Sequence, residues 1–300
     1  MRHSGILIAS ALLLAGAAPA ESVNAVRFAP WINGTAASEP PMQVQRIDAD
    51  TIVIRQSVKT NFEAPFLYLL FGRDAVLLLD TGAGGLAVRP TIDRVIADWQ
   101  ARHGGRPLRL IVAHSHAHGD HIAGDAEFAD RPDTVIVGHS PADVAAFFGI
   151  RAWPDTIGQY DLGGRTLDII PTPGHEPSHI MVYDRRTHLM LSGDMLYPGR
   201  LYVPADQIDT LRASSARLAA FARTHRIRAL LGAHIEMTTT PGQDYPMRAP
   251  EHPDEHALAL SPDAIGQLQA AIAAEPAVPV IERRADFILY PLPPRPRPAG

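Results

Sequence analysis

The chain has 300 residues, of which 46% are hydrophobic and 20% are charged, and its formal net charge is −5 at pH 7. This composition is typical of a globular protein with a substantial core, and the acidic balance excludes a general nucleic-acid binder, because no basic excess is available to neutralise phosphates. The chain has no cysteine, which excludes disulfides, thiolate nucleophiles and thiolate metal ligands.

The first twenty residues predict an export signal. Arg2 gives a positively charged start, an apolar stretch runs over 6–18, and Ala18-Pro19-Ala20 matches a small-residue cleavage site. The apolar stretch is shorter than the roughly 20 residues that a membrane-spanning helix needs. We therefore expect residues 1–20 to be a cleaved signal peptide and the mature protein to be periplasmic or secreted, without a membrane anchor. Residues 21–300 are expected to form one domain with a Pro-rich C-terminal tail.

Strand and helix patterns alternate along the rest of the chain. Residues 21–50 lack strong periodicity and are expected to be an irregular lead-in, and 238–256 is expected to be a Pro-rich loop. Apolar and β-branched runs predict strands at 51–58, 66–71, 75–79, 108–113, 134–137, 165–170, 180–183, 188–191, 229–231 and 286–290. Apolar spacing and helix-start residues predict helices at 88–102, 141–148, 206–224 and 261–274. The pattern predicts two mixed sheets covered by helices.

The strongest chemical signal follows the fourth predicted strand, where His116, His118, Asp120 and His121 form the pattern H-x-H-x-D-H. His116 and His118 are two residues apart in extended backbone, so their side chains can point the same way and hold one metal ion. Gly119 permits a bend, after which Asp120 and His121 can reach a second ion. Imidazole and carboxylate ligands suit zinc or a similar divalent ion. Four such groups after a buried strand are costly for stability alone, although His-rich tracts can be incidental.

Three later blocks follow predicted strands: Thr172-Pro173-Gly174-His175, Ser192-Gly193-Asp194 and Gly232-Ala233-His234. With these blocks, the H-x-H-x-D-H motif and the turn Asp80-Thr81-Gly82, most of the chain after the signal resembles the metallo-β-lactamase superfamily. The resemblance implies an α/β (α+β) fold, the four-layer αβ/βα sandwich of two mixed sheets flanked by helices.

The resemblance also implies a ligand set in two parts. The first metal ion would be held by His116, His118 and His175, and the second by Asp120, His121 and His234. Asp194 would bridge both ions, and the Asp80 turn would support the metal loops without binding metal. The expected cofactor is therefore a pair of divalent ions, with zinc the expected metal.

The remaining histidines are expected to play other parts. His114 and His179 are near the motif and are predicted to support the ligands or the fold. Six others are predicted to lie on the surface or in loops: His103, His139, His188, His225, His252 and His256. Tyr197, Tyr202 and Trp153 are candidates for lining the pocket, with core packing as the alternative.

The predicted chemistry is hydrolysis by a metal-activated water. Two ions about 3.5–4 Å apart lower the pKa of a shared water toward neutrality, and the resulting hydroxide attacks a carbonyl or phosphoryl centre. No Ser or Cys nucleophile is required. Asp120 and Asp194 are the expected catalytic carboxylates, with Asp120 a candidate for orienting the hydroxide or moving a proton.

The expected substrate is a small molecule with an ester, lactone or cyclic amide bond. Export suits a β-lactam, but the familiar lactamases of the family use a Cys at the second metal, and the Cys-free branch generally lacks an acid at the position of Asp194. A bridging Asp is more typical of lactonases, glyoxalase-II-like thioesterases and phosphodiesterases. Two alternatives stay open: an iron-dependent dioxygenase of the same fold, and a non-catalytic metal-binding protein.

Overall fold

The computed structural model describes residues 26–274 and 280–293, so the predicted signal peptide and most of the Pro-rich tail lie outside the described residues. The strands are β1 (Met42–Asp48), β2 (Thr51–Gln56), β3 (Phe66–Phe71), β4 (Ala75–Leu79), β5 (Arg109–Ala113), β6 (Thr134–Ile136), β7 (Gly158–Asp161), β8 (Thr166–Pro171), β9 (Ile180–Asp184), β10 (Leu189–Gly193), β11 (Arg200–Pro204), β12 (Ala229–Gly232), β13 (Ala259–Leu260), β14 (Glu282–Arg283) and β15 (Ile288–Leu292). The helices are α1 (Arg89–Arg102), α2 (Gly119–Ile122), α3 (Pro141–Phe148), α4 (Ile208–Thr224) and α5 (Asp263–Ala274), with 3-10 turns η1 (Asp125–Phe128) and η2 (Ala205–Gln207). Within this part of the chain, none of the helices has the length and apolar character needed to cross a bilayer.

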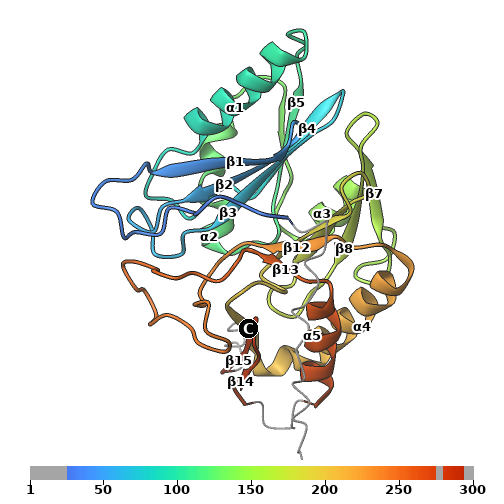
Figure 1. The fold of residues 1–300 in the computed structure, drawn as a ribbon. Coiled ribbons are helices and arrows are strands. Elements are labelled where there is room, and N and C mark those ends of the chain that lie inside the picture. The colour runs from blue at the N-terminus through green and yellow to red at the C-terminus, as the bar shows by residue number, and fades with distance from the viewer. Residues whose placement is uncertain (1–25, 275–279, 294–300) are drawn as a thin grey trace, which may run out of the picture.

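Two six-stranded mixed sheets form the centre of the molecule (Figure 1). The first has the order β1-β2-β3-β4-β5-β6; the pairs from β1 to β4 are antiparallel, and β4, β5 and β6 are parallel. The second has the order β13-β12-β10-β9-β8-β7, in which β10 and β12 are parallel and the other neighbours are antiparallel. A third sheet has the order β11-β15-β14.

Three apolar clusters define four layers. On β3, Tyr68 and Leu70 face the second sheet, whereas Leu69 between them packs on the side covered by α1. Strands buried on both faces lose the alternation of apolar and polar residues, which explains the continuous apolar run of β3. The outer face of the second sheet packs against α4 and α5 through residues such as Leu218 and Leu268. This arrangement confirms the predicted four-layer sandwich of two mixed sheets flanked by helices.

Several elements differ from the sequence prediction. The prediction of an irregular lead-in over 21–50 is wrong for its last part, because residues 42–48 form β1 at the edge of the first sheet. This strand alternates weakly and is only partly buried, so it lacks the apolar signal of a central strand. Strand β11 was not predicted either. It pairs in parallel with the distant β15, and such long-range pairing leaves no local pattern.

Candidate metal centre

The seven predicted ligands lie at one edge of the sandwich. They follow strands of both sheets. Two lie in the loop after β5 and two lie on α2, while β8, β10 and β12 are each followed by one more. The approach is close at Gly193, where φ is 49° and a Cβ atom would lie 2.7 Å from His179 Nε2 and 2.8 Å from Ser115 Cβ. Glycine at this position therefore allows the end of β10 to bring Asp194 against the β5 loop.

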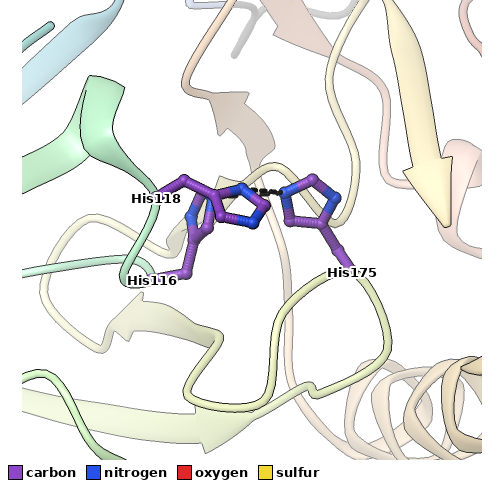
Figure 2. A group of neighbouring side chains, drawn as sticks. All are labelled: His116, His118 and His175. Atoms are coloured by element: carbon purple, nitrogen blue, oxygen red, sulfur yellow. Dashed lines mark hydrogen bonds between the residues drawn. The ribbon is translucent and has the colours of Figure 1, made fainter. Parts of the chain in front are cut away.

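The first group consists of three imidazoles that converge from two loops, as Figure 2 shows. His116 Nε2 lies 3.0 Å from His118 Nδ1, and His175 Nε2 lies 3.2 Å from the former and 3.0 Å from the latter. The Tyr202 carbonyl oxygen lies 2.6 Å from His175 Nδ1. That carbonyl can only accept, so the proton of His175 is on Nδ1 and the Nε2 lone pair faces the other two rings.

The second group combines two imidazoles with a carboxylate. Asp120 Oδ2 lies 3.1 Å from His121 Nε2 and 3.3 Å from His234 Nε2. The other nitrogens of these rings are held from behind, since His121 Nδ1 lies 2.9 Å from Asp80 Oδ2 and His234 Nδ1 lies 2.8 Å from the Glu63 carbonyl oxygen. Both Nε2 atoms therefore point inward, as metal-ligating histidines do.

The Asp194 side chain lies between the two groups. Its Oδ1 is 3.6 Å from His121 Nε2 and 3.5 Å from His234 Nε2, whereas its Oδ2 is 3.6 Å from His175 Nε2. Oδ1 is buried and has no hydrogen-bond partner among the described residues. A buried carboxylate oxygen without a partner is costly, and a cation beside it would remove that cost. The donor set and this orphaned oxygen therefore fit two divalent ions.

The two groups differ in electrostatics. In the first, burial together with the His121 charge holds the pKa of His116 well below its usual range, and burial together with His175 lowers the pKa of His118 to about 4. In the second, burial also opposes protonation, but Asp194 and Asp120 outweigh it and raise the pKa of His234 to about 10. At pH 7 His116 and His118 are therefore neutral, whereas His234 in the metal-free protein is protonated and positively charged.

Neighbouring polar side chains hold the ligands in place. Asp80 accepts hydrogen bonds from the Ser115 backbone N–H (2.7 Å) and the Ser115 hydroxyl (2.9 Å), in addition to its contact with His121. His179 lies fully buried, with its Nε2 3.1 Å from the backbone nitrogen of Asp194. These contacts agree with the supporting parts expected for the Asp80 turn and His179.

The other histidines and aromatic residues singled out in the sequence lie in different environments. His114 is buried and lies 2.8 Å from Asp125, which also contacts His139, so these three form a separate cluster beside the β5 loop. His252 lies in a loop as predicted but is buried rather than exposed, because its ring stacks on Tyr245. Tyr202 lines a pocket beside the metal centre, Tyr197 is buried with its ring 5.5 Å from that of His234, and Trp153 packs against the core between the sheets.

Two buried arginines, Arg55 and Arg200, were not predicted from the sequence. Arg55 forms an ion pair with Glu255, and Arg200 pairs with Glu236 and Asp244. All these partners lie far apart in the chain or in the predicted loop at 238–256, so no local pattern links them. For Arg55 the available signal was its place in a predicted apolar strand, where a long charged side chain needs a buried partner. Arg200 lies in β11, which was not predicted.

Comparison with known proteins identifies the family. A model described as the metallo-beta-lactamase superfamily matches residues 61–245. The chain belongs to this superfamily. It is 30% identical over 178 residues to a hydroxyacylglutathione hydrolase from Rhizobium meliloti (strain 1021), covering 55% of this chain and 66% of the relative. It is 24% identical over 201 residues to an acyl-coenzyme A thioesterase from Bos taurus, covering 56% of this chain and 72% of the relative.

The fold is shared with a solved metallo-beta-lactamase from Pontibacter korlensis. The TM-score is 0.51 at 15% sequence identity, and the match covers 78% of this chain and 100% of that chain. At this identity the likeness shows the fold alone. The superfamily match and the two relatives support a metal-dependent hydrolase, in agreement with the sequence prediction.

The pKa values of this superfamily member predict that a divalent cation would bind to the second group with a stronger pH dependence than to the first. A cation must displace the proton from His234, and from His121, whose pKa is also raised because Asp80 and Asp120 outweigh its burial. We expect the affinity of the second group to rise about tenfold per pH unit for each proton displaced, until the pH passes about 10, the pKa of His234. Above pH 7, His116 and His118 have no proton to lose, so their titration should change the affinity of the first group little.

Calorimetric zinc titrations in buffers of different ionisation enthalpy test this difference by counting released protons. Equal proton release at both sites would contradict it. The raised pKa of His234 also stabilises the metal-free fold. This contribution is fully present below pH 6.5 and is lost as the pH rises through about 10.

Proposed function

We propose that the protein is a dinuclear zinc hydrolase that cleaves an ester, thioester or lactone bond. The observation that carries this proposal is the position of Asp194, whose two carboxylate oxygens each face a different group of ligands. The group of His116, His118 and His175 would hold one ion and the group of Asp120, His121 and His234 the other. When bound, two such ions activate water and polarise the substrate oxygen.

The chain's own residues orient the reactants. The Asp120 side chain is 21% exposed, whereas those of His121 and His234 are 0% and 5% exposed. Its carboxylate is therefore the member of its group that is most accessible to a water molecule from the solvent side. Burial opposes ionisation of Asp120, but His121 and His234 hold its pKa well below its usual range. Asp120 is thus an acceptor at neutral pH and can orient an attacking water by taking a hydrogen bond from it.

Two considerations favour an acyl ester or thioester over a β-lactam. The relatives are named a hydroxyacylglutathione hydrolase and an acyl-coenzyme A thioesterase, and both names describe removal of an acyl group. The β-lactamase neighbour supports the fold only. Neither the dioxygenase nor the non-catalytic alternative gains support from these relatives. We further propose that residues 1–20 direct export to the periplasm or beyond and that 21–300 form a single domain.

A substrate panel with metal removal and restoration tests the function. The zinc-loaded protein would be assayed with a hydroxyacylglutathione, a short-chain 4-nitrophenyl ester, a γ-lactone and nitrocefin. We expect turnover of at least one acyl substrate, its loss after chelation and its return with zinc. Unchanged activity after complete metal removal, or oxygen uptake by a protein that holds a single iron, would contradict the proposal.

A further inference from the structure

A pocket of about 280 Å³ is lined by residues that contact the ligands of the metal centre. Its wall includes Glu63 and Tyr202, whose carbonyl oxygens lie 2.8 and 2.6 Å from the Nδ1 atoms of two ligands, His234 and His175. It also includes Ile235, which follows His234 in the chain. Two residues whose carbonyl oxygens hold metal ligands therefore also line this pocket.

The outer wall of the pocket carries exposed apolar side chains. Phe62, Met247 and Leu292 line it and are 37%, 61% and 36% exposed. Six large apolar side chains are exposed in the described part of the chain, and three of them are gathered here. Apolar side chains clustered at a pocket beside a reactive centre are typical of a ligand-binding site.

The charges around the pocket are unevenly balanced. Arg200 is neutralised by Glu236 at 3.1 Å and Asp244 at 2.7 Å. The Arg248 guanidinium lies 4.7 Å from the centre of the Phe62 ring and has no ion-pair partner among residues 26–274 and 280–293. The one other acidic group of the wall, Glu63, lies beside His234 at the metal end. The outer end of the pocket is therefore positively charged.

The segment that carries Arg248 is held at both ends. Before it, Arg200 donates a hydrogen bond to the Tyr245 carbonyl oxygen; after it, the Tyr245 ring stacks on His252 with centroids 4.4 Å apart. Glu255 then pairs with the buried Arg55. Arg248 itself has a φ of 61°, a backbone conformation that costs a non-glycine residue energy and that is concentrated at binding sites.

From these observations we propose that the pocket binds the part of the substrate remote from the scissile bond, and that this part is an apolar chain with an anionic tail. The acyl carbonyl lies at the metal centre, the chain lies along Phe62 and Met247, and the anion pairs with Arg248. This inference rests on the proposed hydrolase function and specifies its substrate class as an acyl ester or thioester with a negatively charged end.

Two esters that share the same 4-nitrophenol leaving group test the proposal. Mono-4-nitrophenyl octanedioate has a carboxylate tail, and 4-nitrophenyl octanoate is neutral. In zinc-loaded protein, Arg248→Gln should raise KM for the charged ester about 5-fold, the upper range for an exposed ion pair, and change KM for the neutral ester less than about 2-fold. Arg248→Lys should keep most of the preference because it keeps the charge. Arg102→Gln, on the exposed end of α1, is the matched control and should leave both KM values unchanged.

Equal effects of Arg248→Gln on the two esters, or no preference of the wild type for the charged ester, would overturn the proposal. If the wild type hydrolyses neither ester, the proposed ester hydrolysis fails, and calorimetric binding of octanedioate and octanoate to the zinc-loaded protein tests the pocket separately. Preferential binding of octanedioate that is lost in Arg248→Gln would support the anion site. Equal binding of the two acids would reject it.

Discussion

Replacing Asp194 by Ala is expected to lower kcat/KM for ester hydrolysis by about 10³-fold or more, as removal of a charge-stabilising group from an active site does. Its carboxylate faces both ligand groups, and Oδ1 has no hydrogen-bond partner among the described residues. Removing it leaves both cation positions short of a negative ligand. The measurements are kcat/KM on a 4-nitrophenyl ester and the metal content by elemental analysis.

The matched control for this variant is Asp209→Ala. The Asp209 carboxylate is 94% exposed and pairs with Arg212 on the surface of α4, so its loss should leave activity and metal content unchanged. Asp194→Asn keeps the shape of the side chain and removes its charge, and it should lose activity as the Ala variant does. If Asp194→Ala melted like the wild type, kept both metal ions and stayed within about tenfold of wild-type kcat/KM, the assigned role would be wrong.

The largest expected effect on stability is that of Arg165→Met. Arg165 is 2% exposed and lies just before β8, at the end opposite His175. Its guanidinium donates to the Phe71 carbonyl oxygen (3.1 Å) and to the Thr51 hydroxyl (2.8 Å) of the first sheet, and to Asp184 Oδ2 (2.6 Å) of the second. Removing one partner of a buried ion pair costs about 3–5 kcal/mol, which corresponds to a fall in Tm of roughly 6–20 °C.

Differential scanning calorimetry with two further variants isolates this ion pair. Arg165→Met combined with Asp184→Leu removes both charges and should recover part of the lost stability, because no buried charge is left unpaired. Arg73→Met breaks an exposed pair with Asp74, and its effect on stability should be small because solvent screens such pairs. An Arg165→Met variant as stable as the Arg73→Met variant would show that the link between the sheets contributes little.

Much of the metal centre was predictable because its ligands are encoded locally. Each predicted ligand follows a buried strand, and the ends of such strands meet at one edge of the sandwich. The motif from His116 to His121 places four ligands within six residues, so its meaning depends little on the rest of the fold. The continuous apolar runs likewise predicted strands such as β3, which is buried along its whole length.

The substrate pocket was not predictable for the opposite reason. Phe62 and Arg248 meet across the pocket although 186 positions separate them, and each lies in an irregular segment. The partners of Arg200 are Glu236, which lies just after β12, and Asp244, which lies in the segment predicted only as a Pro-rich loop. Contacts between loops depend on tertiary packing, and loop residues carry no periodicity from which such contacts can be inferred.

The edge strand β1 was missed for a related physical reason. Its residues alternate only weakly in burial, and its single neighbour is β2. A strand at the edge of a sheet is solvated on one side and needs fewer apolar side chains than a central one. The polar residues Gln43 and Gln45 therefore hide the strand from pattern analysis, although both bind the preceding segment, through the backbone of Ile32 and Ala29.

The most direct test of the central claim is the structure and metal content of the zinc-loaded protein compared with two single variants. We predict two zinc ions per wild-type chain, one among His116, His118 and His175 and the other among Asp120, His121 and His234, with Asp194 contacting both. His118→Ala should lose the first ion preferentially, and His234→Ala the second. A wild-type protein that binds no zinc, or a single ion away from these side chains, would contradict the account.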